Sequence, residues 1–272
     1  MMIAYLILAH ANFSVCQELI DELLSDERSV VYLHIDAKAK QYDALNGNIH
    51  FVRRVKVHWG GESMVEATLN LLEESLRGQY DRYVLLSGDS FPINDMAKTN
   101  DILMQQPLNE FLSYYENNLG SRGYDRAFCY WLFNEHSSKV CWLINRYLVK
   151  LQKQFKYKRK FPRELSEFRI GSQWWGLTYE SAQKVYDICS NKKVRKFLRH
   201  TRIPDEFFVQ STLGSVNSKD NLMFYEFDFL AKGTYNGVSR LSTKDIPRCI
   251  ESGKLFCRKV NCEFIKELRL KR

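Results

Sequence analysis

The chain has 272 residues and a mass of 32.2 kDa, with 45% hydrophobic and 26% charged residues. This size and composition predict a folded α/β-type protein with a sizeable core, and they exclude a disordered chain, a collagen-like repeat and a disulfide-rich miniprotein. The net charge of +8 is regional, because residues 146–202 hold 16 Lys and Arg against 4 Asp and Glu. Such a stretch is typical of a solvated helix face, and also of contact with nucleic acid, an anionic membrane surface or an acidic substrate.

Seven cysteines are present, and no two of them form a Cys-x-x-Cys pair. Their number and spacing exclude a zinc ribbon and a thioredoxin motif and predict mostly reduced thiols. The apolar start of the chain has no basic residues ahead of it and is too short for a signal core or a membrane span. We therefore expect a cytoplasmic protein.

Buried strands and amphipathic helices alternate through the first hundred residues. Two continuous apolar runs, Ile3–Ala9 and Val30–Ile35, have the pattern of strands buried on both faces of a parallel sheet. Apolar residues at helical spacing over Val15–Leu24 predict the helix that connects them. The alternation continues with three further elements, a strand at 49–52, a helix at Met64–Leu76 and a strand at Tyr83–Leu86.

Polar residues follow three of these predicted strands at their carboxyl ends. They are His10, Asp36 and Asp89. Because ligands of open α/β sheets bind in the crevice beyond those ends, we expect the three side chains to share one site. A simple turn-forming role is the alternative for an Asp in such a position.

The second half of the chain is predicted to mix strands and helices around the basic stretch. The expected elements are a strand at Phe111–Tyr115, a long basic helix at Trp131–Tyr157, a loop at Phe161–Arg169, a strand at Gln173–Leu177, a helix at Tyr179–Cys189 and a strand at Asn221–Leu230. Pro204-Asp-Glu begins another helix, since Pro suits the first helical position and acidic residues suit the first turn. No repeat, low-complexity segment or clear linker divides the chain.

Several familiar site motifs are missing. The first predicted strand is followed by Leu-Ala-His-Ala-Asn-Phe instead of Gly-x-Gly-x-x-Gly, which argues against the usual dinucleotide fold. No Walker loop, Gly-x-Ser-x-Gly elbow or His-Glu-x-x-His pair occurs, and the six histidines lack metal-ligand spacing. The metal-holding Asp-x-Asp of many nucleotide-sugar transferases is also absent. A diphosphate leaving group would therefore need another counter-charge.

Six motifs stand out against this background. They are His34-Ile-Asp36, Trp59-Gly-Gly, Leu85-Leu-Ser-Gly-Asp-Ser-Phe-Pro-Ile93, Gly171-Ser-Gln-Trp-Trp, Pro204-Asp-Glu-Phe-Phe and Leu255-Phe-Cys-Arg-Lys259. In this order they resemble the core-2/I-branching β-1,6-N-acetylglucosaminyltransferase family, to which peptide O-xylosyltransferases also belong. The resemblance implies a GT-A-like (Rossmann-like) α/β fold, an open mixed sheet flanked by helices. It further implies a UDP-sugar donor, inversion at the anomeric carbon and independence from metal, with no cofactor.

The resemblance implies one glycosyltransferase domain over residues 1–272, with a nucleotide-binding half at 1–100 and an acceptor and catalytic half at 101–272. Glu206 matches the catalytic position, where a carboxylate takes the proton of the acceptor hydroxyl. The alternative is that Glu206 only complements a helix N-terminus. Asp205 beside it is expected to point elsewhere, as a cap or structural partner.

Two fixed cations are implied in place of a metal, to stabilise the departing UDP. Lys259 matches one of them, and Arg240 or Arg258 the other, with a solvated surface cation as the alternative for each. His10 and Asp36 match positions that contact uridine. Asp89 matches one that orients the donor sugar or fixes its loop.

Fewer residues indicate where the acceptor binds. Trp174 and Trp175 are candidates to stack on sugar faces, but alternation along a strand lets at most one of them face the cleft, and core packing explains the other. Three further residues lie where family members vary in acceptor contacts, Glu116, Arg122 and Arg126.

We therefore expect an inverting transferase that moves a sugar, N-acetylglucosamine by the resemblance, from a UDP-sugar to a glycan or lipid-linked glycan. Transfer of xylose or glucuronic acid, and an inactive glycan-binding relative, are the alternatives. A nucleic-acid partner is not expected, because no reader motif occurs and the strand-end acids would repel phosphates. The basic segment Arg146–Lys160 is instead expected to dock on an anionic inner-membrane leaflet, where lipid-linked acceptors reside.

Overall fold

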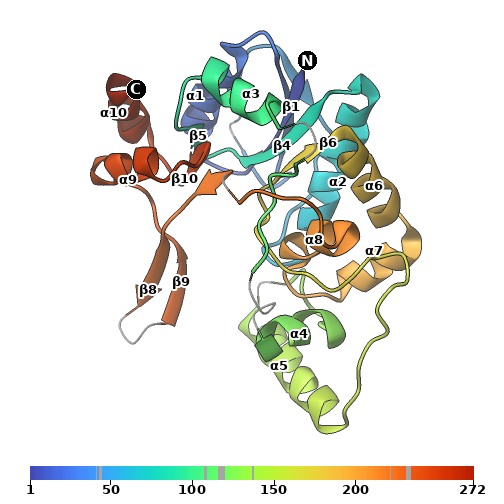
Figure 1. Ribbon diagram of the computed structural model, residues 1–272. Coiled ribbons are helices and arrows are strands. Elements are labelled where there is room, and N and C mark those ends of the chain that lie inside the picture. Colours follow the sequence, from blue (N-terminus) through green and yellow to red (C-terminus); the bar gives the residue numbers. More distant parts are fainter. Residues whose placement is uncertain are drawn as a thin grey trace.

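The structure is a computed structural model that describes residues 1–40, 42, 45–106, 109–115, 120–136, 138–220, 222–230 and 234–272 (Figure 1). Side chains are not described at 120–122, 227–230 and 234–236. The main sheet has five strands in the order β3-β2-β1-β4-β6. Their bounds are Ile3–Ala9 for β1, Ser29–Ile35 for β2, Ile49–Phe51 for β3, Arg82–Ser87 for β4 and Gly176–Thr178 for β6. β6 runs antiparallel to β4 and the other neighbours are parallel, so the predicted open mixed sheet is confirmed.

Helices flank this sheet, as expected for an α/β fold (Figure 1). They are α1 (Phe13–Leu24), α2 (Ser63–Ser75), α3 (Met96–Met104), α4 (Gly120–Phe128), α5 (Lys139–Gln154), α6 (Tyr179–Cys189), α7 (Lys192–Arg199), α8 (Phe208–Leu213), α9 (Ile246–Glu251) and α10 (Cys262–Lys271), with 3₁₀ turns at Leu76–Gly78, Pro204–Glu206 and Thr243–Asp245. α1 contacts β2, while α2 contacts both β1 and β2 and also α6.

Two small sheets extend the molecule beyond the main one. The first has the order β5-β10-β7, from Ser90–Pro92, Phe256–Arg258 and Met223–Phe224, and the second pairs β8 (Phe227–Leu230) with β9 (Thr234–Val238). β10 lies antiparallel to β5, which directly follows β4 along the chain. This pairing carries the end of the chain back to the carboxyl end of the central sheet.

The core explains why the apolar runs became central strands. All seven residues of β1 are buried, because helices cover both faces of a strand that has neighbours on both edges. One hydrophobic cluster joins β1 and β4 to Trp175 and Phe208 from the second half of the chain. A second cluster, around Phe91 and Phe264, lies under α9 and α10.

The structure confirms the predicted strand at Ile3–Ala9 and the predicted helix at Tyr179–Cys189 residue for residue. The predicted strand at Phe111–Tyr115 is wrong, since only isolated bridges form there, from Glu110 and Phe111. The predicted helix at Trp131–Tyr157 is too long. It begins at Lys139, where the Ser138 side chain accepts a hydrogen bond from the N–H of Val140 and caps it.

Two further findings concern membrane spans and the cysteines. None of the helices in the described ranges is long and apolar enough to cross a membrane. All seven cysteines lie within those ranges and are free thiols, as the spacing predicted.

Candidate active site

The carboxyl ends of the central strands form one edge, and the predicted polar residues lie along it. The backbone N–H groups of Asp36 and Gly88 each donate to a carbonyl of the last two residues of β1, at 2.9 Å. These bonds hold the ends of β2 and β4 against β1. His10 is exposed and directly follows β1. It therefore lies at the same edge of the sheet as the buried Asp36 and as the loop that carries Asp89.

His34 and Asp36 both hold the segment that leads to Trp59. The Nε2 of His34 accepts from the N–H of Val55 at 3.1 Å, and Oδ1 of Asp36 accepts from the N–H of Val57 at 3.3 Å. Burial lowers the pKa of His34 to about 4, so its imidazole is the neutral acceptor at pH 7. The sequence alone did not indicate this positioning role for the His-Ile-Asp motif.

Arg258, at the end of β10, reaches across to the loop after β4. Its Nε lies 3.0 Å from Oγ of Ser87 and 3.5 Å from Oδ1 of Asp89, and its guanidinium lies 4.8 Å from the centre of the Trp174 ring. The backbone carbonyl of Asp89 also accepts from the N–H of Val260 at 3.1 Å. A cation, a carboxylate and an indole thus meet beside the strand ends.

Lys259 and Arg240 lie on adjoining segments. The Nζ of Lys259 donates to the carbonyl of Val238 at 2.9 Å, and the N–H of Leu241 donates to the carbonyl of Lys259 at 2.9 Å. Arg240, one residue before Leu241, is exposed. The three candidate cations are therefore contributed by two neighbouring stretches of chain, and Arg258 is the one that contacts Asp89.

Glu206 ends the 3₁₀ turn Pro204–Glu206. Its Oε2 lies 2.8 Å from Nη1 of Arg126, which comes from α4, and its backbone carbonyl accepts from the N–H of Gly171 at 2.9 Å. A Cβ at Gly171 would overlap the carbonyl of Ser113, so only glycine allows this approach. The Gly171-Ser-Gln-Trp-Trp motif is therefore held next to Glu206, the candidate base.

Asp205 is buried beside Glu206, and its Oδ1 has no hydrogen-bond partner among the described residues. Burial, and next the Glu206 carboxylate, raise the pKa of Asp205 to about 7, while Arg126 and Arg258 act in the opposite direction. The charges of Glu206, Arg126 and Arg258 all contribute to the pKa of this one carboxyl.

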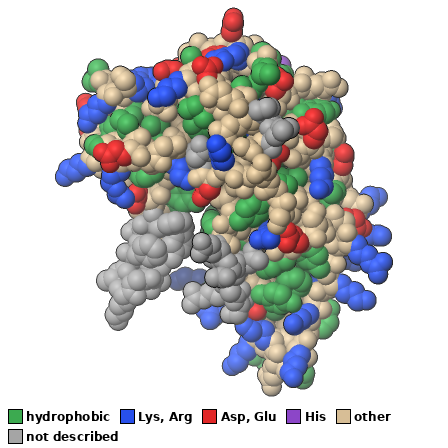
Figure 2. All heavy atoms as spheres, in the orientation of Figure 1, with side chains coloured by type: hydrophobic (Ala, Val, Ile, Leu, Met, Phe, Trp, Pro, Cys, Tyr) green, Lys and Arg blue, Asp and Glu red, His purple; other side chains and the backbone are tan. Residues whose placement is uncertain are grey.

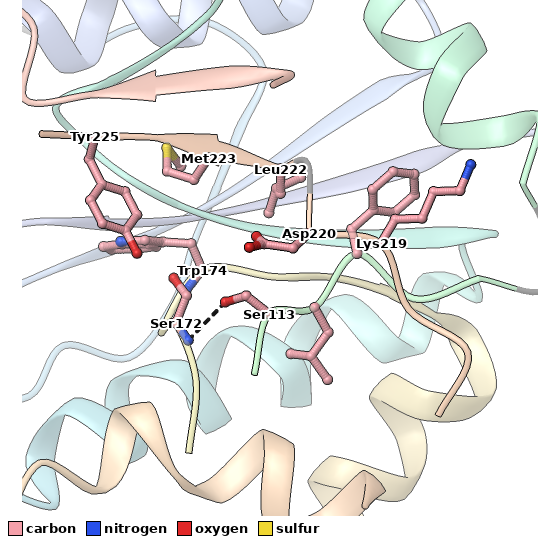
Figure 3. A pocket seen from close by; sticks show the side chains of 10 residues that line it. Ser113, Ser172, Trp174, Lys219, Asp220, Leu222, Met223 and Tyr225 are labelled. Atoms are coloured by element: carbon pink, nitrogen blue, oxygen red, sulfur yellow. Dashed lines mark hydrogen bonds between the residues drawn. The ribbon is translucent and has the colours of Figure 1, made fainter. Parts of the chain in front are cut away.

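A small pocket adjoins this site (Figure 3). Tyr225 and Trp174 lie side by side in it above Ser172, whose N–H donates to Oγ of Ser113 at 3.1 Å. Trp174 keeps 6% of its surface exposed, whereas Trp175 is wholly buried in the core. The acceptor role predicted for Trp175 is thus excluded by its burial, and Trp174 alone lies at the site.

Other predicted residues are less informative. Glu116 lies outside the described residues, as does the side chain of Arg122. Arg126 lies at the site, but as the partner of Glu206, a pairing between residues 80 positions apart that no local pattern indicates. Within the described ranges, no group of three or more His, Cys, Asp or Glu residues is arranged to hold a metal ion.

The family model for core-2/I-branching enzymes matches residues 3–225. The protein therefore belongs to the core-2/I-branching enzyme family, as the motifs predicted. It is similar to the xylosyltransferase sqv-6 of Caenorhabditis elegans, with 25% identity over 209 residues. The match covers 71% of this chain and 24% of sqv-6, so the chain spans about a quarter of that relative's length.

Among solved structures, the chain aligns with that of a Bacillus anthracis protein described as a glucose-1-phosphate thymidylyltransferase, in complex with a sucrose. The two chains share 13% identity with a TM-score of 0.38, over 80% of this chain and 86% of the other.

Proposed function

We propose that this protein transfers a sugar from a UDP-sugar to a hydroxyl of a glycan acceptor, with inversion and without a metal, and that Glu206 is its general base. The observation that carries the proposal is the pairing of Glu206 with Arg126 beside the carboxyl edge of the sheet. Glu206 keeps 28% of its side chain exposed, so a substrate hydroxyl has access to it. Its orientation is held at both ends, by Arg126 at the carboxylate and by Gly171 at the backbone.

In this reaction the acceptor hydroxyl gives its proton to Glu206 while its oxygen bonds to the sugar C1. The bond from C1 to the β-phosphate oxygen breaks on the opposite face, and UDP leaves with the bonding electrons. The negative charge that develops on the diphosphate requires a fixed positive counterpart. Arg258, Lys259 and Arg240 are the residues proposed to supply it.

The donor nucleotide is proposed to lie along the first half, residues 1–100, with the acceptor bound by residues 101–272. His10 and Asp36 would contact the uridine, since a carboxylate accepts from a uracil N–H or a ribose hydroxyl. Asp89 is proposed to orient the donor sugar and Trp174 to contact the acceptor. The resemblance favours N-acetylglucosamine as the donor sugar, while the similarity to sqv-6 makes xylose the second candidate.

The direct test compares Glu206→Gln with wild type. Turnover should fall by about 10³-fold, because a positioned base contributes that order of magnitude, while UDP binding measured by calorimetry stays within a few-fold. Glu180→Gln, on the exposed start of α6, is the matched control and should leave both quantities unchanged. Near-normal turnover in Glu206→Gln would remove Glu206 from the mechanism. UDP binding with no transfer from any UDP-sugar would instead support the inactive, glycan-binding alternative.

A second proposal concerns α5, which we infer to contact an anionic membrane surface. Large apolar side chains repeat at helical spacing on its solvent face, Val140, Leu143, Ile144 and Tyr147. Lys139, Arg146 and Lys150 flank that stripe, and the helix contains no acidic residue. Lys and Arg side chains crowd the part of the molecule near α5 and α7 (Figures 1 and 2). An exposed apolar stripe edged by cations suits the headgroup region of an anionic bilayer.

Vesicle co-sedimentation tests this contact. Binding should increase with the fraction of phosphatidylglycerol in phosphatidylcholine vesicles and should fall in the double variant Leu143→Gln, Tyr147→Gln. Leu270→Gln, an equally exposed position on α10, is the control. Binding that is indifferent to anionic lipid would contradict the proposal.

A further inference from the structure

A groove of about 370 Å³ is lined in part by Arg202, whose N–H donates to the backbone carbonyl of Arg126. Three indole rings, those of Trp59, Trp131 and Trp142, line it together with Phe133, Lys139 and Arg202. The lining comes from four stretches, the loop of the Trp-Gly-Gly motif, the segment before α5, α5 itself, and the segment after α7 that carries Arg202. Of these residues, only Lys139 has been assigned a role above, beside the apolar stripe of α5.

Backbone hydrogen bonds connect the groove to the segments that carry the candidate active site. The N–H of Ile203 donates to the carbonyl of Gly60 at 3.0 Å, and the N–H of Arg202 donates to the carbonyl of Arg126 at 3.0 Å. Arg126 in turn pairs with Glu206. These contacts place the groove next to the segments that carry Arg126 and Glu206.

Hydrogen bonds fix both walls of the groove. The carboxylate of Glu135 accepts from the N–H and Oγ of Ser63, at 3.0 and 2.7 Å, and a Cβ at Gly61 would overlap that carboxylate. On the other wall, Oδ1 of Asn145 in α5 accepts from the N–H of Leu132 at 2.9 Å. The walls are thus preorganised, which lowers the entropic cost of binding.

The three indoles differ in how much surface they offer. Trp59 is 74% exposed, and no aromatic or cationic group stacks on it among the described residues. Arg146 lies over Trp142, at 4.9 Å from the ring centre, and Arg202 lies over Trp131, at 4.7 Å. Trp59 is therefore the open platform, while the other two indoles hold arginines in place. An open indole face suits the apolar C–H face of a sugar ring.

The groove is also positively charged. Lys139 and Arg202 line it, and the carboxylate of Glu135 is bonded to Ser63 behind one wall. Neither cation forms an ion pair within the described part of the chain. Burial, followed by the neighbouring charges of Arg126 and Arg146, lowers the pKa of Arg202. A ligand that brings negative charge would relieve that repulsion.

From these observations we propose that the groove is a subsite for an anionic oligosaccharide, one whose sugar units carry carboxylate or phosphate groups, and that it holds the acceptor chain beyond the sugar at Glu206. The sugar ring stacks on Trp59, and the acidic group lies near Lys139 and Arg202. This subsite deepens the proposed function, on which its assignment to the acceptor rests. Binding itself is testable without any transfer.

The first experiment measures direct binding by calorimetry. The probes are a chondroitin hexasaccharide for carboxylates, a glycerol-phosphate hexamer bearing glucose for phosphates, and neutral chitohexaose for comparison. Wild type should bind one anionic probe at least about tenfold more tightly than chitohexaose. Trp59→Ala should weaken that binding by about tenfold, and Phe51→Ala, an exposed aromatic on β3 outside the groove, should not. Which anionic probe binds identifies the acidic group.

The second experiment separates charge from stacking. Lys139→Gln should reduce the preference for the anionic probe and the salt dependence of its binding, whereas Lys98→Gln, exposed on α3, should change neither. Three results would overturn the subsite proposal. They are equal affinity of wild type and Trp59→Ala for the anionic probe, equal affinity of wild type for the anionic probe and for chitohexaose, and no binding of any probe.

Failure of the subsite proposal can be distinguished from failure of the proposed function. Release of UDP from the donor in the absence of acceptor reports the donor site alone, and Trp59→Ala and Trp142→Ala should retain it while the acceptor KM increases. A wild type that binds the anionic probe but neither binds nor cleaves any UDP-sugar would overturn the transferase and leave the groove as a glycan-binding site.

Discussion

Arg126 and Glu206 face each other at 2.8 Å, and each keeps about a quarter of its side chain exposed. One comes from α4 and the other from the 3₁₀ turn after α7. A charge-assisted bond of this length fixes the direction of the carboxylate without sealing it from solvent. Arg126 is thus a positioning residue for the candidate base.

Replacement of Arg126 should therefore affect turnover more than donor binding. We expect Arg126→Gln to lower kcat by about tenfold or more, since a misplaced base loses much of its 10²–10⁴-fold contribution, with the donor KM within about twofold of wild type. Arg126→Lys should recover part of the loss. Arg163→Gln, at an exposed position in the loop between α5 and β6, is the control. Steady-state kinetics with both substrates varied checks this, and an unchanged kcat would contradict the positioning role.

Arg258 is expected to act on the donor instead. Arg258→Gln would remove the proposed charge-assisted contact to the diphosphate, so UDP affinity should fall by about tenfold or more. Because the change also leaves Asp89 without its cation, thermal unfolding should be followed in parallel, and the double variant with Asp89→Asn should restore stability but not affinity. Arg77→Gln, which loses only a surface pair with Glu74, should leave UDP affinity unchanged. Unaltered UDP binding in Arg258→Gln would assign the diphosphate to Lys259 and Arg240.

Metal removal gives a separate test of the cation proposal. Transfer should proceed at an unchanged rate after treatment with EDTA, because fixed side-chain charges would supply the stabilisation that a metal supplies elsewhere. The measurement is initial rate with EDTA, with added Mn²⁺ and with neither. Loss of activity in EDTA that Mn²⁺ restores would reject the metal-free mechanism.

Asp205 should make the protein less stable as the pH rises. Its folded pKa of about 7 lies above its ordinary value of 3.8, so the folded state holds a proton that the unfolded chain releases between those two pH values. Its contribution is lost across that window at up to about 1.4 kcal/mol per pH unit. Asp205→Asn removes this dependence, and its free energy of unfolding in urea should increase relative to wild type from pH 4 to pH 7. A pH-independent difference would refute the buried, protonated state.

His34 should have the opposite effect on stability and make the protein less stable as the pH falls. Its folded pKa of about 4 lies below its ordinary value of 6.5, so its contribution is present above pH 6.5 and is lost as the pH falls toward 4. His34→Gln keeps an acceptor for the N–H of Val55 but does not titrate, and it should gain stability relative to wild type over that interval. His50→Gln, an exposed imidazole on β3, is the control. Urea unfolding at pH 4.5, 5.5 and 7 measures the difference.

Local periodicity was sufficient to predict the elements of the first half. Ile3–Ala9 reads as a strand because seven consecutive apolar residues suit only a position buried on both faces, and the structure agrees residue for residue. Phe111–Tyr115 shows the limit of this reasoning. Phe111 and Leu112 are buried, and Tyr114 and Tyr115 are half-buried, without joining a strand ladder. Burial and pairing are decided by neighbours that are distant in sequence.

The sequence by itself determined the family, the alternation of strands and helices, and the position of Glu206 within a motif, because each is written in neighbouring residues. Only the tertiary structure decided which charges act together. It brought Arg126 to Glu206 and Arg258 to Asp89, buried Trp175 while leaving Trp174 at the site, and joined Trp59 to Trp142 in one groove. Each of these pairs except the two adjacent indoles is separated by 80 or more positions, and electrostatic and stacking energies depend on distance in space and not along the chain.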